Sequence, residues 1–504
     1  MTEQTKKVLL TGASGSMGNA AFLELMAWPD RPDIVLLVRP SAVNKKKFVA
    51  YEGGKSTPAG RKSIVEHDGL KIVWGDLTCY EDVLEAVAGV DAVLHPAAFI
   101  SPAADHDPDL AEKTNVGAAQ NLVRAIKAQP DNGDHVRLVH VSSLAIYGDR
   151  LPPIHWVRCG DPLKPSVYDF YAVTKTRAEK TVIESGLKYW ASIRQSYIAI
   201  TDLFRLMDPI MYHQPLNTCM EMVTDEDAGY GLVQTLACPD DFYGRIYNMG
   251  GGPGGRITFI DYLSKMMRLL GLGDFRKIMD RDWFALRNFH CSFFEDSGVL
   301  NEYLGHWRQS VENHCQQVVD EAPWYVPLGK LAPSVLVKKF LMEPMAKQKN
   351  GPLGWLKNEN EGRISAFYGS REKVRAIPGW EAPVSPTPET FQRLDHGYDD
   401  SKADHALTLA DLRDAADFRG GQCLTEAFES MRHALEWKCA FGHTWKATPT
   451  LVLRAGHWCP ECLPPAWNYD EIAKKNPFFA QIYYPNHDRD EQNFYDARCF
   501  EDIV

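Results

Sequence analysis

The sequence predicts an α/β fold over its first 275 residues or so, with a doubly wound parallel sheet that helices cover on both faces. Three observations lead to this prediction. Short apolar runs alternate with amphipathic stretches at helical spacing, a glycine-rich turn follows the first apolar run, and later runs end in small or hydroxyl-bearing residues. Parallel strands buried on both faces have continuous apolar sequences, and helices must connect them.

The expected elements follow one another in a regular order. Apolar runs predict strands at residues 8–10, 34–38, 70–74, 92–95, 136–142, 189–193 and 246–249. Apolar residues recur at helical spacing in 82–87 and 115–126. Another helix is predicted at 259–269, where Thr258 is a suitable N-cap.

Four segments are expected along the chain. Residues 1–275 form a dinucleotide-binding and catalytic domain, and residues 276–375 a smaller, mostly helical extension on the substrate side. Residues 376–406 form a linker, because four prolines crowd its first half. Residues 407–504 hold a C-terminal metal-binding module and a polar tail.

Composition excludes several classes of protein. The 504 residues are 45% hydrophobic and 24% charged, as in ordinary globular proteins. No apolar run is long enough to span a membrane, and the first residues lead directly into a strand without a leader-like segment, so we expect a cytoplasmic protein with no membrane partner. The net charge of −11 argues against nucleic acid as a ligand. Eleven cysteines are too sparse for a disulfide scaffold.

The glycine-rich turn predicts a dinucleotide site of the Rossmann type. Gly12 allows a tight turn, Gly15 lets the backbone approach a pyrophosphate, and Gly18 lets helix and strand pack closely. The helix that begins here directs its free amides at the phosphates. The expected cofactor contacts in this turn also include Ser14, Ser16 and Met17.

The ends of the next strands refine this prediction. Arg39 follows the second strand, where NAD sites carry an acidic residue, so we predict a preference for NADP(H) over NAD(H). The lysines at 45–47 are interpreted as a solvated loop. Asp76 and Leu77 follow the third strand and could meet the adenine, although Asp76 could equally begin a helix. Ala97 lies where the backbone must pass close to the nicotinamide ribose.

Tyr171 and Lys175 form a candidate acid–base pair. They are four residues apart and therefore share one helix face. Tyrosine has an ordinary pKa near 10, and a nearby ammonium lowers it toward a useful range. Ser142 and Ser143 end the fifth strand and could bring a hydroxyl to the same pocket.

With these motifs, the chain resembles the extended short-chain dehydrogenases/reductases over roughly residues 6–275. Further matching pieces are Asn115-Val116-Gly117 and Tyr247-Asn248-Met249-Gly250-Gly251. The resemblance implies that Tyr171 donates or accepts the proton, that Lys175 lowers its pKa and holds the nicotinamide ribose, and that Ser143 orients the substrate oxygen, with Ser142 as a substitute. It also implies a homodimer and a small-molecule substrate.

Departures from the family pattern narrow the substrate. Residues 194–201 lack the Arg-Pro and the turn that sugar-nucleotide members carry after the sixth strand. We therefore favour an oxidoreductase acting on a non-nucleotide carbonyl or alcohol compound. An epimerase or dehydratase of a sugar-like substrate and a non-enzymatic nucleotide sensor remain alternatives. An apolar pocket is one interpretation, and core packing another, of these residues: Met207, Met211, Tyr212, Met220 and Met222.

Near the C-terminus, Cys439, His443, Cys459 and Cys462 have the spacing of a structural zinc site. They resemble the zinc-ribbon pattern, and His457 is a spare candidate ligand. The expected core of this module is Trp437, Trp445, Trp458 and Trp467, and zinc binding would compensate for its small size. A brace or lid on the reductase is favoured over nucleic-acid binding.

Two remaining His–Cys pairs lack metal-site spacing. His290-Cys291 and His314-Cys315 are interpreted as core or surface residues. The run from Asn288 to His290 could border the substrate cleft, but the sequence does not decide this.

Overall fold

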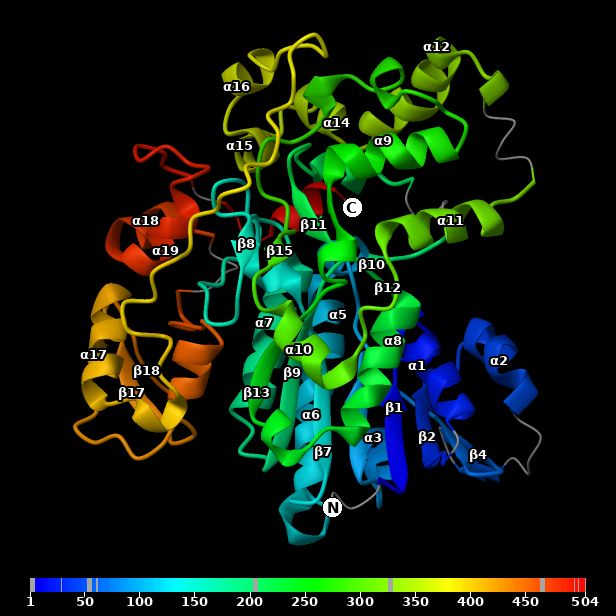
Figure 1. Cartoon of the computed structure of the whole chain (residues 1–504), viewed down its shortest axis with the longest axis vertical. Coiled ribbons are helices and arrows are strands. Elements are labelled where there is room, and N and C mark those ends of the chain that lie inside the picture. The colour runs from blue at the N-terminus through cyan, green and yellow to red at the C-terminus, as the bar shows by residue number, and fades with distance from the viewer. Residues whose placement is uncertain are drawn as a thin grey trace.

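The computed structural model describes residues 5–28, 30–51, 57–59, 62–202, 207–324, 330–462, 467–493, 495–496 and 498–503. Within these residues, a nine-stranded sheet has the order β13-β9-β7-β6-β1-β2-β5-β4-β3 (Figure 1). Its parallel strands are β1 (Lys7–Thr11), β2 (Asp33–Val38), β5 (Leu70–Trp74), β6 (Ala92–His95), β7 (Arg137–Ser143), β9 (Tyr189–Gln195) and β13 (Arg245–Met249). These strands confirm the predicted parallel sheet. An antiparallel hairpin of β4 (Lys62–His67) and β3 (Thr57–Ala59) extends one edge and was not predicted.

Helices cover both faces of this sheet. On one face lie α1 (Ser16–Ala27) and α8 (Asp225–Gln234), and on the other α3 (Tyr80–Val87), α6 (Gly117–Lys127) and α7 (Phe170–Ile183). The side chains of β1 alternate accordingly: Val8 and Leu10 pack with the first helix pair, whereas Leu9 packs with the second group. The doubly wound α/β fold is therefore confirmed.

A second lobe covers the carboxyl end of the sheet. Its short strands are β8 (Trp156–Val157), β10 (Ile198–Ala199), β11 (Cys219–Glu221), β12 (Val223–Thr224), β14 (Arg256–Thr258) and β15 (Phe293–Phe294). Its helices include α9 (Phe259–Leu269), α11 (Val311–Glu321), α12 (Ser334–Val337), α13 (Glu343–Ala346), α14 (Pro352–Lys357), α15 (Glu361–Tyr368) and α16 (Arg371–Arg375), whereas α10 (Ser297–Leu304) packs on β13 and α8 of the α/β domain. The predicted helix at 259–269 is confirmed, and Thr258 caps it by accepting from the Asp261 amide. No described helix is both long enough and apolar enough to cross a lipid bilayer.

The C-terminal unit is built on the outer face of α7. Residues 376–403 reach it without forming a helix or strand. The unit contains α17 (Leu409–Phe418), a small sheet of β16 (Gln422–Cys423), β17 (Leu435–Lys438) and β18 (Thr444–Ala447), a π-helical turn (Thr450–Arg454), α18 (Tyr469–Lys475) and α19 (Pro477–Tyr483). In Figure 1 it lies beside α7 and β13, away from α1.

This unit does not have a separate small core. Leu412, Trp437 and Leu451 belong to the same buried cluster as Ala178 and Val182 of α7. The expected small core of this module is therefore part of a larger one, continuous with the core of the α/β domain, and the compensating role of zinc stays a prediction. The division of the chain at 275, 375 and 406 itself stays a prediction.

A buried polar network also joins the two parts. Glu179 on α7 accepts from Arg194 Nη2 at 2.8 Å and pairs with His457 Nε2 at 3.0 Å. Arg194 in turn donates to the Ala455 carbonyl at 2.6 Å and to Tyr147 Oη at 2.7 Å. His457, a spare metal ligand in the sequence analysis, is thus a partner of Glu179, and that suggestion is wrong.

Candidate active site

The glycine turn between β1 and α1 has the geometry that the sequence predicts. Gly12 has φ +66°, and a Cβ atom there would lie 2.8 Å from Ala97 Cα. A Cβ on Gly18 would lie 2.1 Å from the Gly12 carbonyl oxygen, so only glycine lets α1 pack this closely. A Cβ on Gly15, by contrast, would approach only one atom, at 3.5 Å. The open space above Gly15 is the space that a pyrophosphate needs.

The other predicted cofactor contacts gather around this turn. Those that line the same cavity are Ser14, Ser16, Met17, Arg39, Asp76, Leu77 and Ala97. Asp76 Oδ1 also accepts from the Thr78 amide and hydroxyl, at 2.8 Å each, so it shapes the local turn as well.

The lysines after β2 do not form a loop. They belong to helix α2 (Ala42–Phe48), which Ser41 caps. Lys47 Nζ donates to the Ser14 carbonyl at 3.1 Å, and Lys45 Nζ lies 3.6 Å from the centre of the Trp74 ring. The interpretation of 45–47 as a loop is therefore wrong, because these residues are helical, although Lys46 and Lys47 are exposed to solvent as expected.

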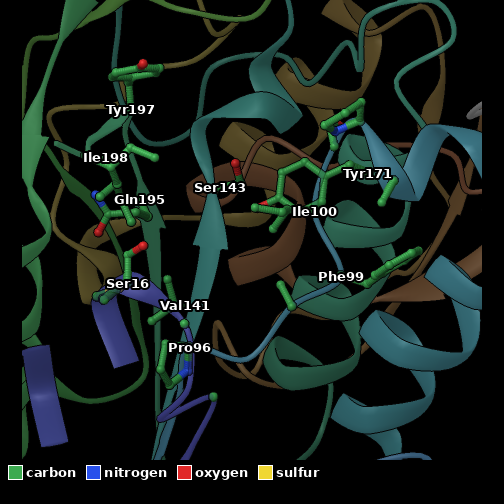
Figure 2. Close-up of a pocket in the computed structure, with 18 of the residues that line it drawn as sticks. Ser16, Pro96, Phe99, Ile100, Val141, Ser143, Tyr171, Gln195, Tyr197 and Ile198 are labelled. Atoms are coloured by element: carbon green, nitrogen blue, oxygen red, sulfur yellow. The ribbon is translucent and has the colours of Figure 1, made fainter. Parts of the chain in front are cut away.

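Helix α7 and the end of β7 bring the acid–base residues together. Tyr171, Lys175, Ser142 and Ser143 all line the cavity. In Figure 2 the Tyr171 ring reaches from α7 toward Ser143, with Phe99 and Ile100 on the same side of the pocket. Lys175 Nζ donates to the Val141 carbonyl at 2.5 Å. Asn115, from the matched motif, donates to Thr174 at 2.9 Å and exchanges two hydrogen bonds with the Phe99 backbone, which fixes the loop after β6 against α7.

Burial controls the ionisation of this pair. It raises the pKa of the Tyr171 phenol to about 12, although a hydrogen bond with Ser143 opposes the shift. It lowers the pKa of Lys175 to about 8, against the opposing effect of Glu179. The expectation that Lys175 lowers the pKa of Tyr171 is not met, because the phenolate loses water and the ammonium points to Val141. Tyr171 is therefore a neutral phenol at neutral pH.

The far half of the cavity is apolar. The cavity has a volume of about 980 Å³ and continues from the glycine turn past Tyr171. Its lining there includes Tyr197, Ile198, Ile200, Met207, Ile210, Met211, Phe259, Tyr262, Leu263, Met266, Met267, Leu270 and Phe289. Of the five residues proposed for an apolar pocket, Met207 and Met211 line it, while Tyr212, Met220 and Met222 are buried in the core.

One feature of this half was missed in the sequence, and a second, the position of His290 at the cleft, was left undecided. The sequence predicted α9 as a helix but not as part of the cavity lining. The signal that could have indicated this role is the high density of aromatic and methionine residues on α9. His290 and Cys291, interpreted as core or surface residues, both line the cavity. Asn288 does not, since its side chain bonds the Val167 backbone, whereas His314 and Cys315 are buried in the core as expected.

His290 carries a carboxylate partner. Its Nδ1 lies 2.7 Å from Asp169 Oδ2, and its side chain is 21% exposed, toward the cavity that it lines. Burial disfavours the imidazolium, but Asp169 outweighs it and raises the pKa of His290. Burial, together with the nearby Asp169, raises the pKa of Asp105 to about 7, and Asp105 accepts from the Tyr171 amide at 3.2 Å. A second group able to exchange protons thus lies close to Tyr171.

The four predicted metal ligands converge in the C-terminal unit. The ligand atoms of Cys439, His443, Cys459 and Cys462 all lie within 4.8 Å of one another. His443 Nδ1 is 3.4–3.5 Å from each sulfur, and the sulfurs of Cys439 and Cys462 are 3.7 Å apart. Trp458 packs against Trp437 and Trp445 nearby. Trp467 does not join them, because it packs on Phe170 at the start of α7.

Comparison with known proteins finds similarity that is confined to the N-terminal part of the chain. Residues 8–196 match the model of the NAD dependent epimerase/dehydratase family. D-erythronate dehydrogenase of Haemophilus influenzae is 30% identical over 151 residues, which are 29% of this chain and 40% of that protein. UDP-glucose 4-epimerase of Rickettsia typhi is 30% identical over 121 residues, 24% of this chain and 32% of that protein. The chain therefore covers about two fifths of the first curated relatives that it matches.

Solved structures include two similar dehydratases. DesIV of Streptomyces venezuelae, a dTDP-glucose 4,6-dehydratase with NAD and TYD bound, has a TM-score of 0.47 and 23% identity, over 63% of this chain and 96% of that one. The dTDP-glucose 4,6-dehydratase of Bacillus anthracis in complex with NAD has a TM-score of 0.48 and 17% identity, over 64% and 96%. The C-terminal unit lies outside the matched family segment.

Proposed function

We propose that this protein is an NADP(H)-dependent oxidoreductase that reduces, or forms, a carbonyl group on an apolar, non-nucleotide small molecule. One observation carries the proposal: a single cavity of about 980 Å³ joins the glycine turn, the Ser143–Tyr171–Lys175 group and an apolar far half. A cofactor and a substrate bound in this one cavity would therefore both reach Tyr171.

The residues at the near end suit a dinucleotide phosphate. The amides that begin α1, together with the space above Gly15, suit the pyrophosphate, and Arg39 at the end of β2 suits the 2′-phosphate of NADP(H). When bound, this cofactor supplies or accepts the hydride. The protein's own contribution is to hold the reacting groups in place and to move a proton.

Proton transfer falls to Tyr171. In the reducing direction, the substrate oxygen accepts hydrogen bonds from Ser143 and Tyr171, and the phenolic proton passes to it as negative charge develops. A phenol with a pKa of about 12 is in its donor form at neutral pH, which is the form that the reducing direction requires. Lys175, one helical turn from Tyr171, would hold the nicotinamide ribose of the bound cofactor while it stays protonated. His290, fixed by Asp169, offers a further polar contact across the cavity.

The lining of the far half favours an apolar substrate over a sugar nucleotide. Among the described residues that line it, none is Arg or Lys, and Asp208 adds a negative charge. A substrate diphosphate would therefore be buried without a cation to compensate it, at high cost. A wall of methionine and aromatic side chains instead fits an apolar skeleton and adapts to its shape.

We also infer that the C-terminal cluster binds structural Zn²⁺. Tetrahedral zinc with Zn–S of about 2.3 Å and Zn–N of about 2.0 Å places sulfurs ~3.8 Å apart and sulfur and nitrogen ~3.5 Å apart. The observed separations of 3.7 Å and 3.4–3.5 Å agree with these values. Three cysteines and a histidine complete the four-coordinate shell and leave no position for a reacting water, so the site supports the fold rather than the chemistry.

The decisive experiment is a substrate panel followed through the absorbance of the reduced nicotinamide. Aliphatic, alicyclic and aromatic ketones and aldehydes are offered with NADPH or NADH to the intact protein and to its Tyr171→Phe variant. We expect net NADPH oxidation with apolar carbonyl compounds, lost in the variant. An epimerase or dehydratase would convert a sugar nucleotide with no net change in free cofactor. A nucleotide sensor would bind NADP(H) and turn over nothing. The implied homodimer is checked on the same sample by its mass in solution.

A further inference from the structure

An exposed apolar face lies on the helical segment of the second lobe that includes α12 and α13. Together with the π-helical turn between them (Lys338–Met342), these helices form a continuous run from Ser334 to Ala346. The α12 face, as we call it, consists of five large apolar residues with their exposed fractions: Leu331 (74%), Val335 (73%), Leu336 (48%), Phe340 (70%) and Leu341 (45%). Soluble proteins rarely expose so many large apolar side chains along one short segment unless something binds there.

The opposite side of this run is firmly anchored. Val337, Met342, Met345 and Ala346 are buried in the core of the second lobe, and the Tyr212 hydroxyl donates to the Met342 carbonyl at 3.2 Å. The run therefore has two apolar sides, of which only one is buried among the residues that the structure describes. The α12 face is presented to the surroundings by a fixed helix, at the outer end of the lobe (Figure 1).

The charge around this face is opposite to that of the whole chain. Residues 330–349 contain five lysines and one glutamate, and with Asp280, which pairs with Lys338 from outside this segment, the net charge is 5 − 2 = +3, while the chain carries −11. Lys338 pairs with Asp280 at 2.6 Å and Lys347 with Glu343 at 2.5 Å, and Lys339 extends beside the exposed Phe340. Apolar side chains flanked by lysines match the interface of a lipid bilayer that carries negative headgroups.

We propose that the α12 face binds the surface of an anionic lipid bilayer. Its apolar side chains enter the headgroup region, and the lysines contact the lipid phosphates. A second copy of the chain fits less well, since a twofold contact through this face would bring its lysines opposite one another. We expected no membrane partner because the sequence has no apolar run long enough to span a bilayer. Binding at the bilayer surface does not require such a run.

The α12 face and the apolar half of the cavity belong to the same lobe. Tyr262 and Met266 of α9 line the cavity and also belong to the buried cluster that includes Val337 and Met342. One small lobe thus contains both the apolar half of the cavity and the α12 face. The membrane proposal itself does not depend on the proposed catalysis, and its test uses no substrate.

The test is flotation of the full-length protein with large vesicles. One set consists of equal parts phosphatidylcholine and phosphatidylglycerol, the other of phosphatidylcholine alone. We expect binding to the anionic set, weakening as salt is added, because the lysine contribution is screened. Val335→Glu should weaken this binding about tenfold or more, the scale set by burial of one large apolar side chain. Val43→Glu on α2 is the matched control, because Val43 is 76% exposed and lies outside the face.

Three results would overturn the proposal. The protein does not float with anionic vesicles, or Val335→Glu and Val43→Glu bind them equally well, or the protein is a dimer that Val335→Glu dissociates while vesicles are ignored. The last result would assign the face to a second copy. Because NADP(H) binding is measured separately on the same variants, a failure of the catalytic proposal leaves these outcomes interpretable.

Discussion

Glu179→Gln tests how strongly the C-terminal unit is joined to the helix that carries Tyr171. Glu179 and Arg194 are both fully buried, and their closest approach is 2.8 Å. Burial by itself would raise the pKa of Glu179. The charge of Arg194 outweighs this effect and holds the pKa of the Glu179 carboxyl well below its ordinary value. The substitution keeps the shape of the side chain but removes its charge. Arg194 then remains buried beside a neutral amide, with the Tyr147 hydroxyl and the Ala455 carbonyl as its remaining acceptors.

The expected loss can be set against an exposed pair of similar geometry. Breaking one side of a buried ion pair costs about 3–5 kcal/mol, because the other charge is left without compensation. Lys265 and Glu312 approach to 2.6 Å but are 36% and 73% exposed. For such a pair the loss is about 1 kcal/mol or less. Glu312→Gln is therefore the matched control, with the same chemical change at a solvated site.

Thermal unfolding, followed separately by tryptophan fluorescence and by far-ultraviolet circular dichroism, measures the difference. We expect Glu179→Gln to lower the midpoint by several degrees and Glu312→Gln to leave it nearly unchanged. Since the pKa of Glu179 is lowered in the folded state, its contribution is present above an unfolded-state pKa of about 4.3 and disappears as the pH falls toward the folded value. Equal midpoints for the two variants at neutral pH would refute the reasoning.

Four further predictions concern the cavity and the metal cluster. Tyr171→Phe should lower the turnover rate by about 10²–10⁴-fold with little change in NADP(H) affinity, measured by steady-state kinetics and titration of bound cofactor. The rate of reduction should be steady below pH 8 and fall above it as Lys175 loses its proton, since its pKa is about 8, and a pH profile without this limb would contradict that role. Arg39→Ala should weaken NADP(H) binding about tenfold, the loss of one charge-assisted contact, and leave NAD(H) binding unchanged in calorimetry. Cys439→Ser should reduce bound zinc in elemental analysis and lower the unfolding midpoint, whereas unchanged zinc content would exclude this residue as a ligand.

The sequence allowed the nucleotide end of the site to be predicted because local rules determine it. A positive φ at Gly12 and the contact between Gly18 and the Gly12 carbonyl involve residues only six positions apart. The pair of Tyr171 and Lys175 is likewise set by helical spacing alone. The carboxyl ends of parallel strands meet at one edge of a sheet, which is why Arg39, Asp76, Ala97 and Ser143 could be assigned to one pocket in advance.

The substrate end could not be predicted in the same way. Phe259 begins the predicted helix α9, whereas Phe289 reaches the same cavity from a segment outside any helix or strand, and no local rule brings the two together. His290 is held at the cavity by Asp169, which lies 121 residues earlier and caps α7. This pairing depends on the fold and not on local spacing. The pKa of Tyr171 illustrates the same limit. Spacing indicated a nearby ammonium, whereas the sign of the shift depends on burial, which is a property of the whole fold.

The position of Glu179 explains why a C-terminal unit is built on this side of the molecule. Tyr171, Lys175 and Glu179 follow one another at intervals of four residues and so lie along one face of α7. Glu179 opposes the loss of the Lys175 proton, so its charge keeps that ammonium available at neutral pH. Arg194 and His457 stabilise the buried carboxylate of Glu179. His457 lies two residues before Cys459, one of the four predicted metal ligands. The C-terminal unit therefore helps to stabilise the buried charges next to the helix that carries Tyr171 and Lys175.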